Sequence, residues 1–281
     1  MRFLGLVAIV AIAFFVSIIL FQDNNKNSII SAYEGIPKAA IIDQLYDDVP
    51  RDWFHQQATE YLEAAGYQVD IFTTKDVTVD LFKNLPSMNY KLIIVRTHGV
   101  AEKNIESVTL FTGERYRTDK YISEQLLGLV KKGTPLYRAT FPVQLTDSSE
   151  WNIENDTYRS ISVQAHPNIQ SEDVYFLITP KLVDDIMVGQ FPGTVFFLGG
   201  CSTMKNPSMA SSLIARGASA VVGWDDTVGD YENDIIMIDV LRQYLINDSE
   251  LKEAVKLVME NYEWGDPMYN ATFKYYSEPL V

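Results

Sequence analysis

Two short runs of strong β-formers constrain the fold of this chain more than any other feature. Leu92–Val95 and Val195–Leu198 consist entirely of apolar residues, with no alternation between polar and apolar positions. A continuous apolar run of this length is typical of a parallel strand that is covered on both faces. The two runs therefore predict the centre of a mostly parallel sheet with helices on both sides.

Strand and helix patterns alternate along most of the chain, which predicts a doubly wound α/β fold. Ser107–Arg117 is predicted to form a hairpin that turns at Thr112–Gly113, and 119–132 is predicted to be helical. The polar stretch 139–171 is interpreted as an insertion. We further predict strands at 38–45, 67–73, 91–97, 174–179, 194–199 and 218–224, and helices at 51–65, 79–83, 208–216, 231–246 and 250–262.

Composition indicates a globular protein and excludes one class of partner. Hydrophobic residues make up 47% of the 281 residues and charged residues 21%, so the chain has enough apolar material for a large core. The formal net charge is −14, and no cluster of basic residues with interleaved aromatics occurs. Because clustered Lys and Arg bind nucleic-acid phosphates, we exclude nucleic acid as a partner.

The N-terminal segment predicts where the protein is located. Phe3–Phe21 is almost entirely apolar, and as a helix it would be about 28 Å long, close to the hydrocarbon thickness of a bilayer. Arg2 precedes this run and polar residues follow it, so the positive-inside rule predicts that 1–22 is a single-pass anchor with the rest of the chain outside the cytoplasm. A cleaved signal peptide is the alternative, but cleavage after Ala13 would leave an apolar stub. Residues 23–37 are interpreted as a polar tether.

Two reactive side chains follow the two apolar runs. The strand that contains Leu92–Val95 continues to His98 and Gly99, and the strand that contains Val195–Leu198 continues to Cys201, the one cysteine of the chain. Parallel strands of one sheet end at the same edge, so we expect His98 and Cys201 to be neighbours in space. A lone cysteine is usually a small buried hydrophobe, but this joint placement favours a thiol site.

A thiol beside an imidazole has the chemistry that acyl transfer requires. The thiolate attacks a carbonyl carbon, and the imidazole activates the thiol and later protonates the leaving amine. The N–H groups of Gly99 and Cys201 would form an oxyanion hole, and Gly199 and Gly200 allow a tight turn that exposes the thiol. One cysteine and three scattered histidines predict no structural zinc site, and we expect no metal or other cofactor.

The order of these motifs resembles the caspase-like clan of cysteine peptidases, which includes caspases, legumain, clostripain, gingipains and separase. The shared elements are a hydrophobic strand that ends in His98–Gly99 and a later one that ends in Cys201. Met209–Ala218 followed by Ala220–Asp225 is similar to the helix, Gly-Ala turn, Val-rich strand and Trp-Asp segment of the separase and CHAT-domain branch. The predicted hairpin that begins at Ser107 is also similar to that branch.

The resemblance implies a caspase-like α/β/α sandwich, which we expect at 38–263, with a tail at 264–281. It also implies that Cys201 is the nucleophile and that His98 is the general base and acid. The backbone amides of Gly99 and Cys201 would donate to the oxyanion.

Acidic residues follow the strand beyond the nucleophile. Asp225, Asp226 and Asp230 lie in the segment that the resemblance places at the pocket for the P1 side chain of a substrate. A carboxylate there would select Arg or Lys by charge-assisted hydrogen bonds. The alternative for Asp230 is a capping role at the helix predicted for 231–246.

These features predict a membrane-anchored cysteine endopeptidase that cleaves a peptide or protein after a basic residue, outside the cytoplasm. The alternative is an inactive binding or scaffold module on the same fold, which the acidic surface and the unusual spacing of the acids favour. A third candidate is an extracytoplasmic solute receptor. Thiol reactivity separates the first candidate from the others, because an activated thiolate is alkylated well below the ordinary thiol pKa of about 8.5.

Overall fold

The computed structural model of the protein describes residues 35–102, 107–133, 174–262 and 269–277. The chain divides into two compact units, Met1–Pro37 and Lys38–Val281, and the fold below is that of the second.

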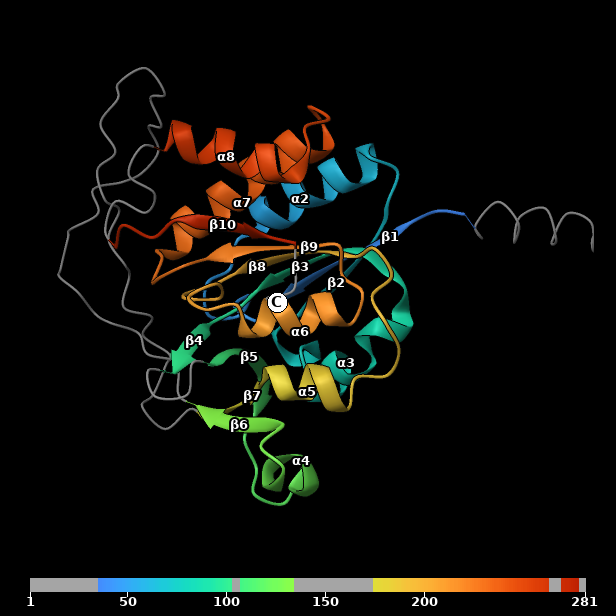
Figure 1. Ribbon diagram of the computed structural model, residues 1–281, viewed down its shortest axis with the longest axis vertical. Helices are drawn as coiled ribbons and strands as arrows, with labels where there is room; N and C mark the ends of the chain where they lie inside the picture. Colours follow the sequence, from blue (N-terminus) through green and yellow to red (C-terminus); the bar gives the residue numbers. More distant parts are fainter. Residues whose placement is uncertain (1–34, 103–106, 134–173, 263–268, 278–281) are drawn as a thin grey trace, which may run out of the picture. The chain divides into compact units, whose positions relative to one another are not determined.

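A six-stranded sheet forms the centre of this unit, in the order β10-β9-β8-β3-β1-β2 (Figure 1). Neighbouring strands are parallel, except that β10 runs antiparallel to β9. The two predicted central runs lie in β3 and β8, which pair with each other. The strands are β1 (Lys38–Asp43), β2 (Gln68–Thr73), β3 (Tyr90–Arg96), β8 (Val195–Gly199), β9 (Ala220–Trp224) and β10 (Phe273–Tyr276).

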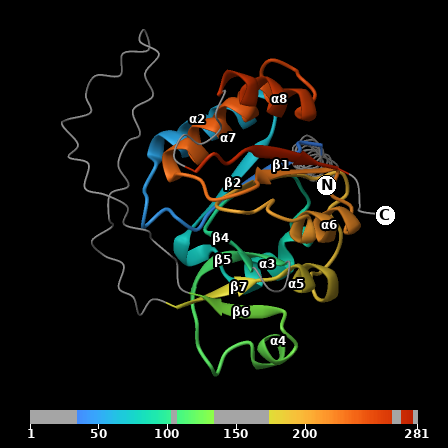
Figure 2. The same ribbon diagram turned by 60° about the vertical axis from the view of Figure 1, so that its left-hand side comes forward.

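Helices cover both faces of the sheet, so both faces of the central strands are buried (Figures 1 and 2). Ile94 and Phe197 pack in one core with Phe54, whereas the residue that precedes each of them on its strand, Ile93 or Phe196, packs in the opposite core. Because successive side chains of a strand point to opposite faces, two cores require a continuous apolar run. One face carries α2 (Asp52–Ala64), α7 (Asp230–Leu245) and α8 (Leu251–Asn261), and the other carries α3 (Val79–Asn84), α5 (Pro180–Asp185) and α6 (Ser208–Ala215).

A second, antiparallel sheet has four strands in the order β4-β5-β7-β6. It lies on the same side of the central sheet as α3 and α5 (Figure 2). Its first strand begins at Gly99, directly after His98, so the chain passes from the central sheet into the small one at this point. The elements of this part are β4 (Gly99–Glu102), β5 (Ser107–Arg115), α4 (Ile122–Leu126), β6 (Val130–Gly133) and β7 (Tyr175–Ile178). Two short 3₁₀ helices, η1 (Thr74–Asp76) and η2 (Leu85–Met88), precede and follow α3 in the chain.

The order in which successive strands are added to the central sheet reverses between β1 and β3. The connection from β1 leads to β2 at one edge, and β3, β8 and β9 then follow on the other side of β1. In open α/β sheets a ligand site forms outside the carboxyl ends of the strands at such a switch point. His98 follows β3 at this place.

The predicted α/β class with a mostly parallel central sheet is confirmed. The predicted strands of that sheet, and the predicted helices that cover it, occur within a few residues of their expected bounds. Two predictions are wrong. Ser107–Arg115 is one strand rather than a hairpin, and it pairs with β4. The segment 119–132 contains only the short α4 and most of β6, because Val130 and Lys131 pair with β7.

Several predictions concern residues that the structure does not describe. These are the anchor at 1–22, most of the tether at 23–37 and the insertion at 139–171. Within the described ranges, no helix has both the length and the apolar character needed to cross a bilayer. The predicted tail at 264–281 includes β10, which completes one edge of the central sheet.

Candidate active site

His98 and Cys201 occupy equivalent places after two neighbouring strands. The last paired residues of β3 and β8 are Arg96 and Gly199, and each reactive residue lies two positions further along its own strand direction. The N–H of Thr97 donates to the carbonyl of Gly199 over 2.8 Å, so the pairing continues beyond the strand ends. The structure therefore brings the two segments together at the carboxyl edge, as the sequence predicts.

Two glycines allow the segments to approach closely. A Cβ atom added at Gly99 would lie 2.3 Å from the carbonyl oxygen of Cys201, and one added at Gly200 would lie 2.0 Å from the carbonyl oxygen of Thr97. Both distances are far below a van der Waals contact, and both clashes are with backbone atoms. No other residue fits at these positions without moving the turn that carries the thiol.

His98 is half-buried and is held through its backbone. Its N–H donates to Oε1 of Gln44 over 3.1 Å, and its carbonyl accepts from the N–H of Phe111 over 3.0 Å. The imidazole meets the ring of Phe111 edge-on, with centroids 5.8 Å apart. These contacts link the residue to β1 and β5, which restricts the positions that the imidazole can adopt.

Cys201 is also half-buried, and it begins a tight turn. Its thiol donates to the carbonyl of Val228 over 3.5 Å. The next residue, Ser202, has a left-handed backbone with φ of 58° and donates its N–H to the carbonyl of Asp226 over 2.8 Å. The turn that carries Cys201 is therefore fastened to the loop that follows β9.

The three predicted pocket acids point to different neighbours. Asp225 accepts from the N–H of Thr272 over 2.7 Å and lies 3.2 Å from Nζ of Lys274, so it extends the pairing of β9 with β10. Asp226 forms an ion pair with Lys205, whose ammonium, together with the N–H of Thr227, holds the pKa of this carboxyl below its usual range.

Asp230 is the first residue of α7 rather than its N-cap, which is Gly229. Its Oδ2 lies 3.3 Å from Nη2 of Arg51, at the start of α2. Of the three acids, Asp226 is the one whose backbone is hydrogen-bonded to Ser202, in the turn that carries Cys201.

A buried ionic network that the sequence analysis missed lies next to this edge. Arg96, two residues before His98, donates Nε and Nη2 to Asp234 over 2.7 and 2.9 Å and Nη1 to Asp43 over 3.0 Å. Burial by itself lowers the pKa of Arg96, but the two carboxylates raise it overall, so the guanidinium stays charged. Nε2 of His55 lies 2.8 Å from the other oxygen of Asp43.

Gln44 is a second residue that the sequence analysis did not single out. It follows β1 at the switch point and is fully buried, and its Oε1 also lies 3.2 Å from the hydroxyl of Thr97. Its Nε2 is buried and has no hydrogen-bond partner among the residues that the structure describes. A polar residue directly after the carboxyl end of a sheet strand is the signal that would have indicated it.

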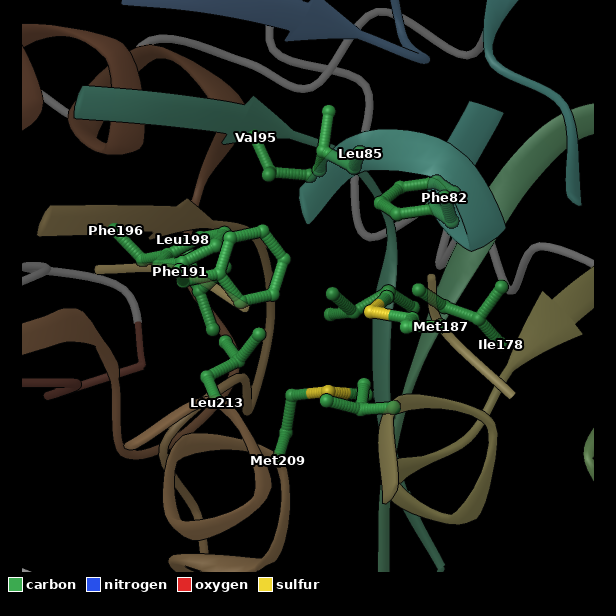
Figure 3. Close-up of a pocket in the computed structure, with 12 residues that line it drawn as sticks. Phe82, Leu85, Val95, Ile178, Met187, Phe191, Phe196, Leu198, Met209 and Leu213 are labelled. Carbon is green, nitrogen blue, oxygen red and sulfur yellow. The ribbon is translucent and has the colours of Figure 1, made fainter. Parts of the chain in front are cut away.

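A narrow cavity lies elsewhere, in the core between the central sheet and α3, α5 and α6 (Figure 3). Its volume is about 10 Å³, room for about one water molecule. All of its lining side chains are apolar, and neither His98 nor Cys201 is among them. We therefore regard it as a packing void of the core, not as a substrate site.

Within the part of the chain that the structure describes, no group of three or more His, Cys, Asp and Glu side chains is placed to hold a metal ion. The sequence matches no protein-family model and no curated protein.

Proposed function

We propose that this protein is a cysteine endopeptidase of the caspase-like type, with Cys201 as nucleophile and His98 as general base and acid. The observation that carries the proposal is the placement of both residues two positions beyond the paired ends of neighbouring parallel strands. The close approach of Gly99 to the backbone of Cys201 supports it, because this contact holds together the two segments that carry the reactive side chains.

The chemistry assigns each group one task. His98 accepts the thiol proton of Cys201, and the sulfur attacks the carbonyl carbon of the scissile peptide bond to give a tetrahedral intermediate. The backbone N–H groups of Gly99 and Cys201 stabilise its oxyanion. The C–N bond then breaks, the leaving amine takes the proton from His98, and water hydrolyses the thioester with His98 again acting as base.

We propose Asp226 as the acid that favours a basic P1 residue, ahead of Asp225 and Asp230. The side chain of Asp226 is half exposed, and its backbone carbonyl accepts a hydrogen bond from the N–H of Ser202, the residue after the nucleophile. Asp225 is held by β10, and Asp230 is held at the start of α7 by Arg51. An ionised carboxylate that solvent reaches, on a residue whose backbone is bonded to the neighbour of Cys201, is suited to bind a guanidinium or an ammonium.

The cellular setting of the proposal comes from the sequence. Residues 1–22 would anchor the protein in a membrane, and the catalytic domain would act on peptides or proteins outside the cytoplasm. No metal or other cofactor takes part in the proposed reaction.

The test uses the full chain with fluorogenic peptides that carry Arg, Lys, Asp, Asn or Leu at P1. We expect hydrolysis after Arg and Lys that is lost in both Cys201→Ala and His98→Ala, and iodoacetamide alkylation of Cys201 well below pH 8.5. Ser202→Ala is a matched control, because its structural role is carried by its backbone N–H. Hydrolysis that persists in Cys201→Ala would overturn the proposal.

One observation favours a second candidate, an inactive binding module on the same fold. All three predicted pocket acids are already paired with cations of the chain, namely Lys274, Lys205 and Arg51. The binding module predicts a thiol that resists iodoacetamide until the protein unfolds, together with no hydrolysis of any of the five peptides.

A further inference from the structure

The turn that follows the nucleophile is fastened to the end of β9 by backbone hydrogen bonds. Ser202 donates to the carbonyl of Asp226 over 2.8 Å, and Met204 donates to that of Trp224 over 2.7 Å. The turn closes on itself where Lys205 donates its N–H to Ser202 over 3.1 Å. The positions of Lys205 and Asp226 are therefore fixed relative to the nucleophile.

The side chains of these two residues meet across the turn. Nζ of Lys205 forms an ion pair with Oδ2 of Asp226, while Oδ1 of the same carboxylate accepts from the N–H of Thr227 over 2.8 Å. About half of each side chain is exposed, 47% for Lys205 and 48% for Asp226. The Asp226 carboxylate is thus paired with the Lys205 ammonium at a position that solvent reaches.

We propose that Lys205 occupies the place of a substrate's basic P1 side chain and competes with it for Asp226. This inference rests on the proposed function, because it assigns a regulatory contact to the pocket of that enzyme. The contact acts as a built-in competitor, and every substrate cation must displace it before the peptide bond can reach Cys201.

The physical character of the pair suits such a role. An exposed Lys–carboxylate pair contributes little free energy, because water solvates both groups and the long side chain loses entropy when it is held. A guanidinium can bind a carboxylate through two parallel hydrogen bonds, which a single ammonium cannot. A substrate Arg therefore displaces Lys205, but at a reduced apparent affinity.

A neighbouring pair in the same loop is a matched control. Lys274 lies 3.2 Å from Asp225, with side-chain exposures of 48% and 33%, so it is the same kind of ion pair one residue earlier in the loop. Asp225 bonds to Thr272, just before β10, and within the described part of the chain no hydrogen bond joins it to the turn that carries Cys201. Removing the ammonium of Lys274 should therefore leave substrate selection unchanged.

The first experiment measures kcat/KM of the full chain for matched peptides with Arg or Leu at P1. We expect Lys205→Met to increase the Arg-to-Leu ratio about two- to fivefold, the range that an exposed ion pair allows. We expect Asp226→Asn to decrease the ratio and Lys274→Met to leave it unchanged. An equal loss for both peptides in Lys205→Met and Asp226→Asn would mean that the pair only holds the turn, and a change in Lys274→Met would point to Asp225. Either result would overturn the inference.

The second experiment does not need turnover, so it separates this inference from the proposed function. Agmatine, a small guanidinium compound, is titrated by NMR into full-length Cys201→Ala protein with and without Lys205→Met. Agmatine should bind the double variant about two- to fivefold more tightly and should not bind Cys201→Ala/Asp226→Asn. Equal affinity with and without Lys205 would overturn the inference. Tighter binding without any Cys201-dependent hydrolysis would support the competition of Lys205 with a guanidinium for Asp226, but it would contradict the peptidase and with it the P1 role of this contact.

Discussion

Arg96 and Asp234 form a bidentate ion pair, with N–O distances of 2.7 and 2.9 Å, and both side chains are fully buried. The pair connects the end of β3 with α7, and the third contact of Arg96, to Asp43, adds the end of β1. The three elements that surround the switch point are therefore joined by one cation, two residues before the proposed general base.

Replacing Arg96 should strongly destabilise the fold. Arg96→Met leaves the carboxylates of Asp43 and Asp234 buried without their main counter-charge, and we expect the free energy of unfolding to fall by about 3–5 kcal/mol. Urea unfolding followed by circular dichroism measures this change. Arg117→Met is the control, because its pair with Asp119 is on the surface and should leave the midpoint unchanged. A wild-type midpoint for Arg96→Met would show that the network does not hold the edge together.

A methyl group at position 99 should inactivate the protein without unfolding it. The Cβ of Gly99→Ala would collide with the carbonyl of Cys201, so the turn that carries the proposed nucleophile must shift. A displacement of about 1 Å costs roughly 100-fold in rate, and we expect a loss of kcat/KM of that order. Gly35→Ala is the control, since nothing lies within 4 Å of its added Cβ. Unchanged kcat/KM in Gly99→Ala would argue against a site built on this contact.

Gln44 should act as a positioning residue for His98. Gln44→Met removes the acceptor of the His98 N–H, and leaving that half-buried donor without a partner should cost at most about 1–3 kcal/mol of stability. The loss is partly offset because Nε2 of Gln44, which has no partner among the described residues, is also removed. We expect kcat/KM to fall about tenfold at all P1 residues as the imidazole moves, with the pH profile of kcat/KM altered. Gln56→Met on the exposed side of α2 is the control. Full activity and an unaltered pH profile in Gln44→Met would contradict the role.

The ionisation of Asp226 should depend on Lys205. Lys205 and the N–H of Thr227 lower the pKa of Asp226 from its ordinary value of 3.8, so the stabilisation from the ionised form is complete above about pH 4 and is lost as the pH falls through the lowered pKa. Lys205→Met should move this pKa back towards 3.8. Carbon-detected NMR titration of the side-chain carboxyl measures the shift. The same midpoint in both proteins would mean that the ammonium does not act on the carboxylate in solution.

Much of the fold follows from local patterns in the sequence. The apolar runs of β3 and β8 predict central strands because a strand between two cores has no polar face, and both strands occur as expected. The parallel alternation then places His98 and Cys201 at one edge. Their equal offset from the last paired residues is a matter of register, which requires the pairing of Arg96 with Gly199.

The failed predictions arise where glycine serves packing and not a turn. Gly113 suggests a hairpin, but its Cβ would lie 1.7 Å from the carbonyl of Thr74, so it is needed for a close approach within one continuous strand. Gly133 after two lysines suggests the end of a helix, whereas a Cβ there would press on Leu177 across the small sheet. Local propensity cannot distinguish these uses, because the colliding atoms come from distant segments.

The sequence by itself determined the α/β class, the parallel centre and the shared edge of the histidine and the cysteine, because apolar periodicity depends only on near neighbours. The tertiary structure alone decided the partners of the charged groups. Arg96 is 53 residues from Asp43 and 138 from Asp234, and the partner of Asp226 is Lys205, 21 residues away. Any of 37 acidic residues could have paired with Arg96, and only the packing of β1, β3 and α7 selects these two.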